Sequence, residues 1–329
     1  MPIFPCILGD MSVLVTGGAG YIGSHVVRLL HQRSEPVLVV DGLSNGLRDR
    51  LGASQFLQLD LAAPNSKQAL TDAIREHGVT SVIHLAAQKQ VGVSVERPEF
   101  YYEQNIGGMS SLLSAMRDTG VDRLVFSSSA ATYGIPDAEA VTEDSECHPI
   151  NPYGETKLIG EWMGANAARS WGLRVANLRY FNVAGTGWPE LADTAVMNLV
   201  PIVFSALKAG KSPIVFGDDY ATPDGSCVRD YVHVHDLADA HLSALDYLER
   251  DERKHSTFNV GTGQGFSVFQ VLAEIKRVTK IDFDIDIQPR RAGDPPYLCA
   301  DVSRIKEELG WQSSRGLNEI IESAWSAIK

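Results

Sequence analysis

The sequence predicts an α/β fold built on a doubly wound parallel sheet, followed by a smaller interleaved lobe. Three observations support this. Short runs of Val, Leu and Ile alternate with stretches of helical periodicity up to about residue 182. A glycine-rich turn at 17–23 joins the first apolar run to the first helical stretch. Strands and helices that alternate at this spacing form a parallel sheet with helices on both faces.

Strands and helices are expected at regular intervals in this first part. The strands are short apolar runs, at 12–16, 37–41, 55–59, 81–84, 123–127 and 173–178. The helices have apolar side chains three and four residues apart, at 22–32, 67–77, 98–118 and 153–170. Pro98 and Asn151-Pro152 mark the starts of the last two helices, because proline is tolerated in a first helical turn.

After residue 182 the alternation weakens, and the loops become longer and richer in Gly and Pro. Short helices are expected near 195–209, 236–248, 268–278, 301–308 and 317–327. No linker rich in Gly and Ser separates the two parts. We therefore expect residues 11–182 to form one domain and 183–329 to form mainly a smaller lobe. Some segments of the lobe should return to the sheet, and the lobe should close over a ligand.

Composition excludes several classes of protein. The 329 residues carry a net charge of -12, which argues against binding to nucleic acid or to an anionic membrane surface. Apolar runs stay well short of the roughly 20 residues that span a bilayer. The four cysteines, Cys6, Cys147, Cys227 and Cys299, are widely spaced, so a disulfide framework or a zinc site is not expected. A reducing, cytoplasmic compartment fits this cysteine usage best.

The first ten residues contain two prolines and lack a basic flank. They are therefore expected to form a disordered extension rather than a signal peptide. Met11 lies directly before the first strand, so the true start is either Met1 or Met11.

The glycine-rich turn predicts a dinucleotide site. Gly17, Gly20 and Gly23 are spaced three apart, between an apolar strand and an amphipathic helix. Glycine there permits a tight turn, close approach of the backbone to a pyrophosphate, and close packing of helix on strand. Asp41 ends the second strand, where a carboxylate accepts hydrogen bonds from ribose hydroxyls and repels a 2′-phosphate. The cofactor predicted is NAD, and the first domain is its Rossmann domain.

A catalytic pair is predicted at the start of the helix at 153–170. Tyr153 and Lys157 are four residues apart and so lie on one helical face. A phenol is a poor base at neutral pH, but a nearby ammonium, a positive nicotinamide ring and the helix N-terminus would favour the phenolate. Ser129, at the end of the preceding strand, could hydrogen-bond the reacting hydroxyl and relay its proton. Ser127 and Ser128 are interpreted as structural.

These motifs resemble the extended short-chain dehydrogenase/reductases over nearly the whole chain. Within them, the closest resemblance is to the family of 4-epimerases that act on UDP-galactose and UDP-glucose. The likeness lies in Val15-Thr-Gly-Gly-Ala-Gly-Tyr-Ile-Gly-Ser-His25, His84-Leu-Ala-Ala-Gln-Lys89, Phe126-Ser-Ser-Ser129, Asn151-Pro-Tyr-Gly-Glu-Thr-Lys157, Arg179-Tyr-Phe-Asn182, Val228-Arg-Asp-Tyr-Val-His-Val234 and Pro289-Arg-Arg-Ala-Gly-Asp294.

The resemblance implies a role for each matching residue. Catalysis would fall to Ser129, Tyr153 and Lys157. The NAD contacts would be Gly17, Gly20, Tyr21, Ile22, Gly23, Asp41, Asn45, Asp60, Leu61, Leu85, Ala86, Lys89, Asn105, Tyr153, Lys157 and Tyr180. The UDP-sugar contacts would be Lys89, Ser129, Tyr153, Asn182, Asn198, Leu199, Arg229, Tyr231, Arg291, Asp294 and Leu298. Arg229 and Arg291 suit this role, because guanidinium groups make bidentate contacts to a diphosphate.

The implied reaction inverts C4 of a UDP-hexose through a transient 4-keto sugar, with Tyr153 removing the proton of the 4-hydroxyl. Three departures from the family pattern bear on it. The loop at 185–195 is shorter than usual, and Ala131 stands where threonine is common. Leu298 falls at the position that gates N-acetylated sugars, although a one-residue slip would put Tyr297 there.

Alternative functions stay open on the sequence. UDP-N-acetylhexosamine or UDP-glucuronate could be the substrate. A 4,6-dehydratase is less favoured, because Ala130-Ala131 stands where such enzymes carry an acid/base pair. From a different class, a non-catalytic NAD sensor would normally lack the tyrosine or the lysine.

Two further expectations concern metals and partners. His233 and His235 alternate on a segment expected to be extended, so they would point to opposite faces and no metal site is predicted. His25 and His84 are interpreted as packed or capping residues. The helices at 98–118 and 153–170 carry more apolar side chains than one sheet face needs, which predicts a homodimer.

Overall fold

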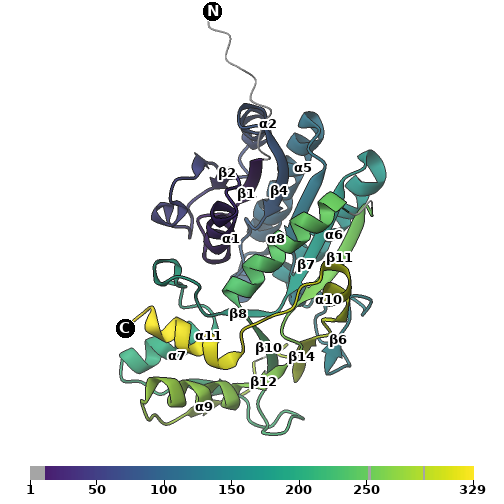
Figure 1. The fold of residues 1–329 in the computed structure, drawn as a ribbon. Coiled ribbons are helices and arrows are strands. Elements are labelled where there is room, and N and C mark those ends of the chain that lie inside the picture. Colours follow the sequence, from purple (N-terminus) through teal and green to yellow (C-terminus); the bar gives the residue numbers. More distant parts are fainter. Residues whose placement is uncertain (1–11, 251–252, 292) are drawn as a thin grey trace, which may run out of the picture.

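A computed structural model describes residues 12–250, 253–291 and 293–329 of the chain (Figure 1). The expected N-terminal extension, with Met1, Cys6 and Met11, lies outside these residues. Within them, no helix is both long enough and apolar enough to cross a bilayer.

The fold is organised around a parallel sheet, which in the described ranges has seven strands in the order β11-β7-β5-β4-β1-β2-β3. All six strands predicted for the first part belong to it. The bounds are β1 (Ser12–Thr16), β2 (Val37–Asp41), β3 (Gln55–Gln58), β4 (Val79–His84), β5 (Arg123–Ser127), β7 (Arg174–Tyr180) and β11 (His255–Val260). The strand β11 comes from the second part of the chain, as expected for a segment that returns to the sheet. The order reverses between β1 and β4, and ligands bind at the carboxyl ends of strands flanking such a reversal.

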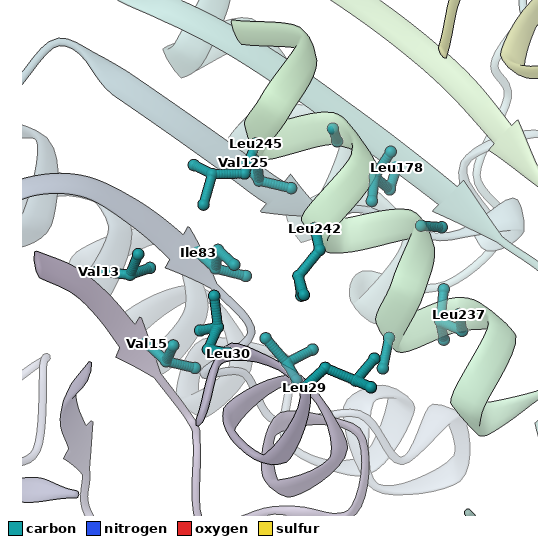
Figure 2. Packing of buried hydrophobic residues seen from close by; sticks show 14 of the residues in the cluster. Val13, Val15, Leu29, Leu30, Ile83, Val125, Leu178, Leu237, Leu242 and Leu245 are labelled. Atoms are coloured by element: carbon teal, nitrogen blue, oxygen red, sulfur yellow. The ribbon is translucent and has the colours of Figure 1, made fainter. Parts of the chain in front are cut away.

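Helices cover both faces of this sheet. On one face lie α1 (Tyr21–Gln32) and α8 (Val234–Arg250), and on the other α2 (Ser66–Glu76), α5 (Gly108–Thr119) and α6 (Pro152–Trp171). Figure 2 shows the first of these layers, where leucines of α1 and α8 meet the branched side chains of the strands beneath. Burial of each such side chain contributes about 1.5–3 kcal/mol, so the two layers fix the strand ends that form the site.

The helix predicted at 98–118 is a run of three pieces. It comprises α4 (Pro98–Tyr101), a π-helical turn η2 (Tyr102–Gly107) and α5. The π turn places the Asn105 side chain inward, where it bonds to Gln88 and to the Thr156 hydroxyl. Such turns often occur at functional sites. The short helix α3 (Val91–Glu96) was also not predicted.

The second part of the chain forms a lobe below the carboxyl ends of the central sheet (Figure 1). Its helices are α7 (Leu199–Lys208), α9 (Val268–Thr279) and α11 (Leu317–Ser326), whereas α10 (Ser303–Leu309) packs beside β11 and α8 against the central sheet. Its strands, joined by β6 from the first part, are β6 (Ala140–Val141), β8 (Asn182–Ala184), β9 (Ile214–Phe216), β10 (Val228–His233), β12 (Gly265–Ser267), β13 (Asp286–Gln288) and β14 (Tyr297–Ala300). Single-turn 3-10 helices occur at η1 (Arg48–Leu51), η3 (Ala130–Thr132) and η4 (Pro189–Leu191).

Two expectations for this lobe need correction. The helix expected from 195 starts at Leu199, because residues before it form an irregular loop. The extended segment expected to carry both His233 and His235 ends at His233, and His235 lies in the first turn of α8. The two residues are close together, since the His235 backbone N–H donates to His233 Nδ1 at 3.0 Å.

Candidate active site

The glycine turn after β1 adopts a shape that only glycine permits at two positions. Gly17 has φ +73°, and a Cβ there would lie 2.6 Å from the backbone nitrogen of Ala86. A Cβ on Gly23 would lie 2.2 Å from the carbonyl oxygen of Gly17. The turn therefore brings α1 against the end of β1, with the helix N-terminus facing the pocket at the strand-order reversal.

One pocket lies over this turn, and every residue that the sequence analysis assigned to NAD lines it. The set is Gly17, Gly20, Tyr21, Ile22, Gly23, Asp41, Asn45, Asp60, Leu61, Leu85, Ala86, Lys89, Asn105, Tyr153, Lys157 and Tyr180. The pocket runs from the acidic end of β2 to the tyrosine and lysine of α6. It has the donors, the glycine cradle and the carboxylate that a dinucleotide needs, so the residues present fit NAD.

Asp41 sits nearly buried at the end of β2. Its carboxylate accepts hydrogen bonds from the backbone N–H groups of Ala19, at 3.0 Å, and Leu43, at 2.8 Å. An ionised carboxylate has about four acceptor positions, so two ribose hydroxyls can still bind to it. Asp60 lines the pocket and also closes a turn, in which its carboxylate accepts from the Ala62 N–H.

The catalytic pair is held by the start of α6. Asn151 caps the helix by accepting from the Gly154 N–H at 2.9 Å, and Pro152 occupies the first turn. Tyr153 and Lys157 are both buried and line the pocket. The Lys157 ammonium donates to the backbone carbonyl oxygen of Ser127 at 2.8 Å.

Burial controls the pKa values of this pair. It lowers the pKa of Lys157 to about 8, because an ammonium loses hydration there. Burial also raises the pKa of Tyr153, while a hydrogen-bonding contact with Ser129 acts in the opposite direction. The expected stabilisation of the phenolate combines the ammonium with the helix N-terminus and a bound nicotinamide ring; in the protein alone, burial has the largest effect on the pKa of Tyr153.

The adjacent serines have different neighbours. Ser129 faces Tyr153, whereas the Ser128 hydroxyl donates to Glu161 at 2.5 Å. Glu161 in turn forms a buried ion pair with Arg179, with nitrogen and oxygen 2.7 Å apart. Ser127 is buried; its backbone carbonyl accepts from Lys157, and its hydroxyl lies 2.6 Å from His241 Nε2.

The substrate candidates of the lobe gather on β10, β14 and the segment before β14. Arg229 donates to the carbonyl oxygen of Pro295 at 2.8 Å and lies 3.7 Å from the Asp294 carboxylate. Arg291 lies 3.6 Å from the same carboxylate and stacks over the Phe216 ring at 4.3 Å. Two guanidinium groups sharing one carboxylate leave a local excess of positive charge in an acidic protein.

The other substrate candidates occupy separate elements. Asn182 pairs in register with Tyr231, which is buried, and Leu199 begins α7. Asn198 donates to Asp193, a residue of the pocket, at 3.3 Å. Leu298 packs with Ala130 and Tyr133, next to Ser129, whereas Tyr297 is absent from that cluster among the described residues.

A loop that the sequence analysis noted for its length completes the pocket. Residues 193–195 and Met197 line it, and so does Arg50. The loop is tied to the first domain by Tyr21, whose hydroxyl donates to the Gly185 carbonyl at 2.5 Å, and by His25, which accepts from the Gly187 N–H at 3.0 Å. Arg50 donates to the Ala192 carbonyl at 2.6 Å. Sequence reasoning missed these pocket residues, since no local pattern brings a loop near 190 to a turn near 20.

The histidines of the first part are packed residues, as interpreted. His84 is buried and bonds to the Thr16 hydroxyl at 2.6 Å, and His25 is buried between α1 and the loop. No group of three or more potential metal ligands occurs in the part of the chain that the structure describes.

The fold and the pocket together define a dinucleotide-binding α/β protein with a tyrosine–lysine pair at one end of its cofactor pocket. Comparison with known proteins gives the family. The NAD dependent epimerase/dehydratase family matches residues 13–261. The chain belongs to this family, and its cofactor is NAD.

Relatives resemble the chain over nearly its full length. A UDP-glucose 4-epimerase of Lactobacillus helveticus is 43% identical over 324 residues, with 96% of each chain covered. A crystal structure of UDP-glucose-4-epimerase from Stenotrophomonas maltophila, with bound NAD and formylated UDP-arabinopyranose, is 39% identical, with a TM-score of 0.92; it covers 96% of this chain and 97% of that one. The UDP-Glc/GlcNAc 4-epimerase from Campylobacter jejuni is 36% identical, with a TM-score of 0.85 and coverage of 96% and 98%.

Proposed function

We propose that the protein interconverts UDP-glucose and UDP-galactose by inverting C4 through a 4-keto intermediate. The observation that carries the proposal is that Tyr153, Lys157 and the glycine turn line one pocket, with Ser129 against Tyr153. The relatives named UDP-glucose 4-epimerase support it. The site residues given above are proposed in their roles, and 11–182 and 183–329 are proposed as the cofactor and substrate domains.

Each residue has a chemical task in this reaction. Tyr153 accepts the proton of the 4-hydroxyl, and Ser129 hydrogen-bonds that hydroxyl and relays the proton. Lys157, fixed on the Ser127 carbonyl, holds the ribose next to the nicotinamide and keeps a positive charge near the phenol. The chemistry that NAD supplies when bound is acceptance of the C4 hydride and its return. Holding the reacting groups together accounts for much of the rate acceleration.

The lobe would hold the UDP while the sugar turns over. Arg229 and Arg291 neutralise the diphosphate, exchanging part of their interaction with Asp294 for phosphate oxygens. Because the nucleotide stays anchored, the keto sugar can present either face to the nicotinamide without leaving. Inversion at C4 then requires only rotation of the sugar.

Rival substrates and activities make distinct predictions. One structurally similar relative is named for both UDP-Glc and GlcNAc, so UDP-N-acetylhexosamines are also candidate substrates. UDP-glucuronate is a further candidate. A 4,6-dehydratase is disfavoured because the small side chains of Ala130 and Ala131 follow Ser129 and offer no acid or base. A non-catalytic NAD sensor is disfavoured because both Tyr153 and Lys157 line the pocket.

The test is to incubate the purified NAD-loaded protein with UDP-glucose, UDP-N-acetylglucosamine and UDP-glucuronate separately and to resolve the nucleotide sugars. We expect UDP-glucose to give UDP-galactose at the highest kcat/KM. A 4-keto-6-deoxy product would instead indicate a dehydratase. The absence of any product would favour the non-catalytic NAD sensor.

A cytoplasmic homodimer is also proposed. The α6 residue Trp162 is 57% exposed on the face away from the sheet, which suits a partner copy. Trp162→Arg should convert a dimer into a monomer of 35.8 kDa in light scattering, and a wild-type monomer would contradict the dimer.

A further inference from the structure

One arginine outside the set assigned to NAD lies between the glycine turn and the loop at 185–195. Arg50 belongs to η1, which follows β2. The segment that leads into η1 packs against the glycine turn. The Leu47 N–H donates to the Ala19 carbonyl oxygen at 2.9 Å, and a Cβ on Gly46 would lie 2.8 Å from the Ala19 Cβ. Arg50 therefore lies close to the start of α1, and it lines the cofactor pocket.

The guanidinium group of Arg50 is bound to the loop by one nitrogen. Nη2 donates to the Ala192 carbonyl oxygen at 2.6 Å and lies 3.4 Å from Thr194 Oγ1. Within the described ranges, its hydrogen bonds come from Nη2 alone, and Nε is buried without a partner. A guanidinium carries five N–H donors, so Arg50 still has donors to offer to a ligand in the pocket.

The position of Arg50 costs stability in the protein alone. Burial lowers the pKa of Arg50, because the charged form loses hydration, while the charge of Asp193 acts in the opposite direction. The Asp193 carboxylate already accepts from the Ala195 N–H at 3.0 Å and from the Asn198 side chain at 3.3 Å. A buried N–H without an acceptor adds a further cost. A cation that burial disfavours, placed at the border of a cofactor pocket, suits an anionic ligand better than it suits the fold.

The anionic part of NAD is its pyrophosphate, which dinucleotide-binding folds hold at the N-terminus of the first helix. At that end of α1, Gly20 and Tyr21 line the same pocket as Arg50 and Thr194. The Tyr21 hydroxyl also donates to the Gly185 carbonyl oxygen, so the loop is fixed to this helix at its other end. The N-terminus of α1, the guanidinium and the loop thus border one space, and a guanidinium is well suited to phosphate oxygens.

We propose that Arg50 is a further cofactor-binding residue, which donates to the pyrophosphate of NAD while its Nη2 holds the loop at 185–195 beside the pocket. This role deepens the proposed NAD site and does not depend on which sugar reacts. Because one guanidinium contacts both the loop and the pyrophosphate, bound NAD should hold the loop in place, and the loop should slow the release of NAD.

The test measures binding and therefore needs no turnover. Arg50→Met keeps an unbranched apolar side chain and removes the guanidinium. Calorimetry on protein stripped of cofactor compares three ligands: NAD, ADP-ribose, which keeps the pyrophosphate, and adenosine, which has no phosphate. We expect the affinities for NAD and ADP-ribose to fall about tenfold, and that for adenosine to stay within about twofold. Exchange of bound NAD for isotope-labelled NAD should be about tenfold faster in the loaded variant.

Arg48→Met is the matched control. Arg48 belongs to the same turn and carries the same charge, but it is exposed and its guanidinium lies 4.6 Å from the centre of the Phe56 ring. It is not among the described residues that line the pocket. Arg48→Met should leave all three affinities within about twofold of wild type. In urea unfolding of the stripped proteins, Arg50→Met should be as stable as wild type or more stable, since it removes a buried and partly unpaired cation.

Two results would overturn the proposal. Unchanged affinities for NAD and ADP-ribose in Arg50→Met would show that Arg50 does not contact the pyrophosphate. An equal fall for adenosine would show that the pocket had changed shape. If Arg50→Met does not fold, Arg50→Lys replaces it: a single ammonium cannot bind the loop and the pyrophosphate in the same way, so the affinities for NAD and ADP-ribose alone should fall about threefold, and unchanged affinities would overturn the proposal. Loss of epimerase activity in wild type would refute the proposed function without affecting these affinities.

Discussion

The Lys157 ammonium donates to the Ser127 carbonyl oxygen at 2.8 Å inside the protein, where burial lowers its pKa to about 8. The unfolded chain holds this proton up to about pH 10.4, so it binds more protons than the folded protein between these values. The free energy of unfolding contributed by this lysine should therefore rise as pH increases from about 8 to 10.4.

Lys157→Met removes the ammonium, so a comparison of this variant with wild type isolates the contribution of Lys157 to the pH dependence of the free energy of unfolding. We expect the difference in unfolding free energy between wild type and variant to change by about 3 kcal/mol across this range, in favour of wild type at high pH. Urea titrations at a series of pH values measure it. A constant difference would mean that Lys157 keeps an ordinary pKa.

Acid should destabilise the protein through histidines that are buried and neutral. Burial lowers the pKa of His25 to about 4 and that of His84 to about 3. Since the unfolded chain takes up these protons near pH 6.5, the free energy of unfolding should fall as pH decreases from 6.5 towards 4. The expected slope is about 1.4 kcal/mol per pH unit for each histidine. A free energy of unfolding that stays flat between pH 6.5 and 5 would contradict it.

Cofactor choice is predicted to depend on the charge of Asp41. Asp41→Asn keeps the shape and one acceptor for the Ala19 and Leu43 N–H groups but removes the charge that repels a 2′-phosphate. We expect NAD affinity to fall about tenfold and NADP affinity to rise, as measured by calorimetry on protein stripped of cofactor. An unchanged ratio of the two affinities would show that another residue selects NAD.

Sugar choice is predicted to depend on Leu298. Its side chain packs in one cluster with Ala130 and Tyr133, next to Ser129, and we propose that it borders the space in which the sugar turns. Leu298→Ala should raise the kcat/KM ratio of UDP-N-acetylglucosamine to UDP-glucose by about tenfold, and Leu298→Tyr should lower it. Equal ratios in all three proteins would place the selecting residue elsewhere.

The sequence predicted the central sheet well because its strands are continuous apolar runs, and it predicted the cofactor pocket because glycine spacing and strand ends follow local rules. It missed the π turn at Asn105, which is a single turn inside a longer helical run. It also missed Asp193 and Arg50 in the pocket. The loop that carries Asp193 is held near the glycine turn by two long-range hydrogen bonds. The Tyr21 hydroxyl donates to Gly185, and His25 accepts from Gly187, more than 150 positions away in each case, and no local pattern encodes such contacts.

The contact between Ser127 and His241 was not predicted for a similar reason. Three consecutive serines end this strand, and only the resemblance to the family indicates which of them faces the sugar. No local pattern shows that Ser127 contacts His241, 114 residues later. This pairing of buried polar side chains depends on how α8 packs on the sheet. The sequence predicts that α8 is a helix but does not predict where it packs.

The central claim is that the Tyr153 phenol acts as the base on a sugar whose UDP is held elsewhere, and Tyr153→Phe tests it most directly. Interconversion of UDP-glucose and UDP-galactose and binding of UDP would be measured on the NAD-loaded variant and on wild type. We predict that the variant binds UDP within about threefold of wild type and loses roughly 10³-fold or more in kcat. Turnover within about tenfold of wild type would contradict the account, because the base would then have to be another group.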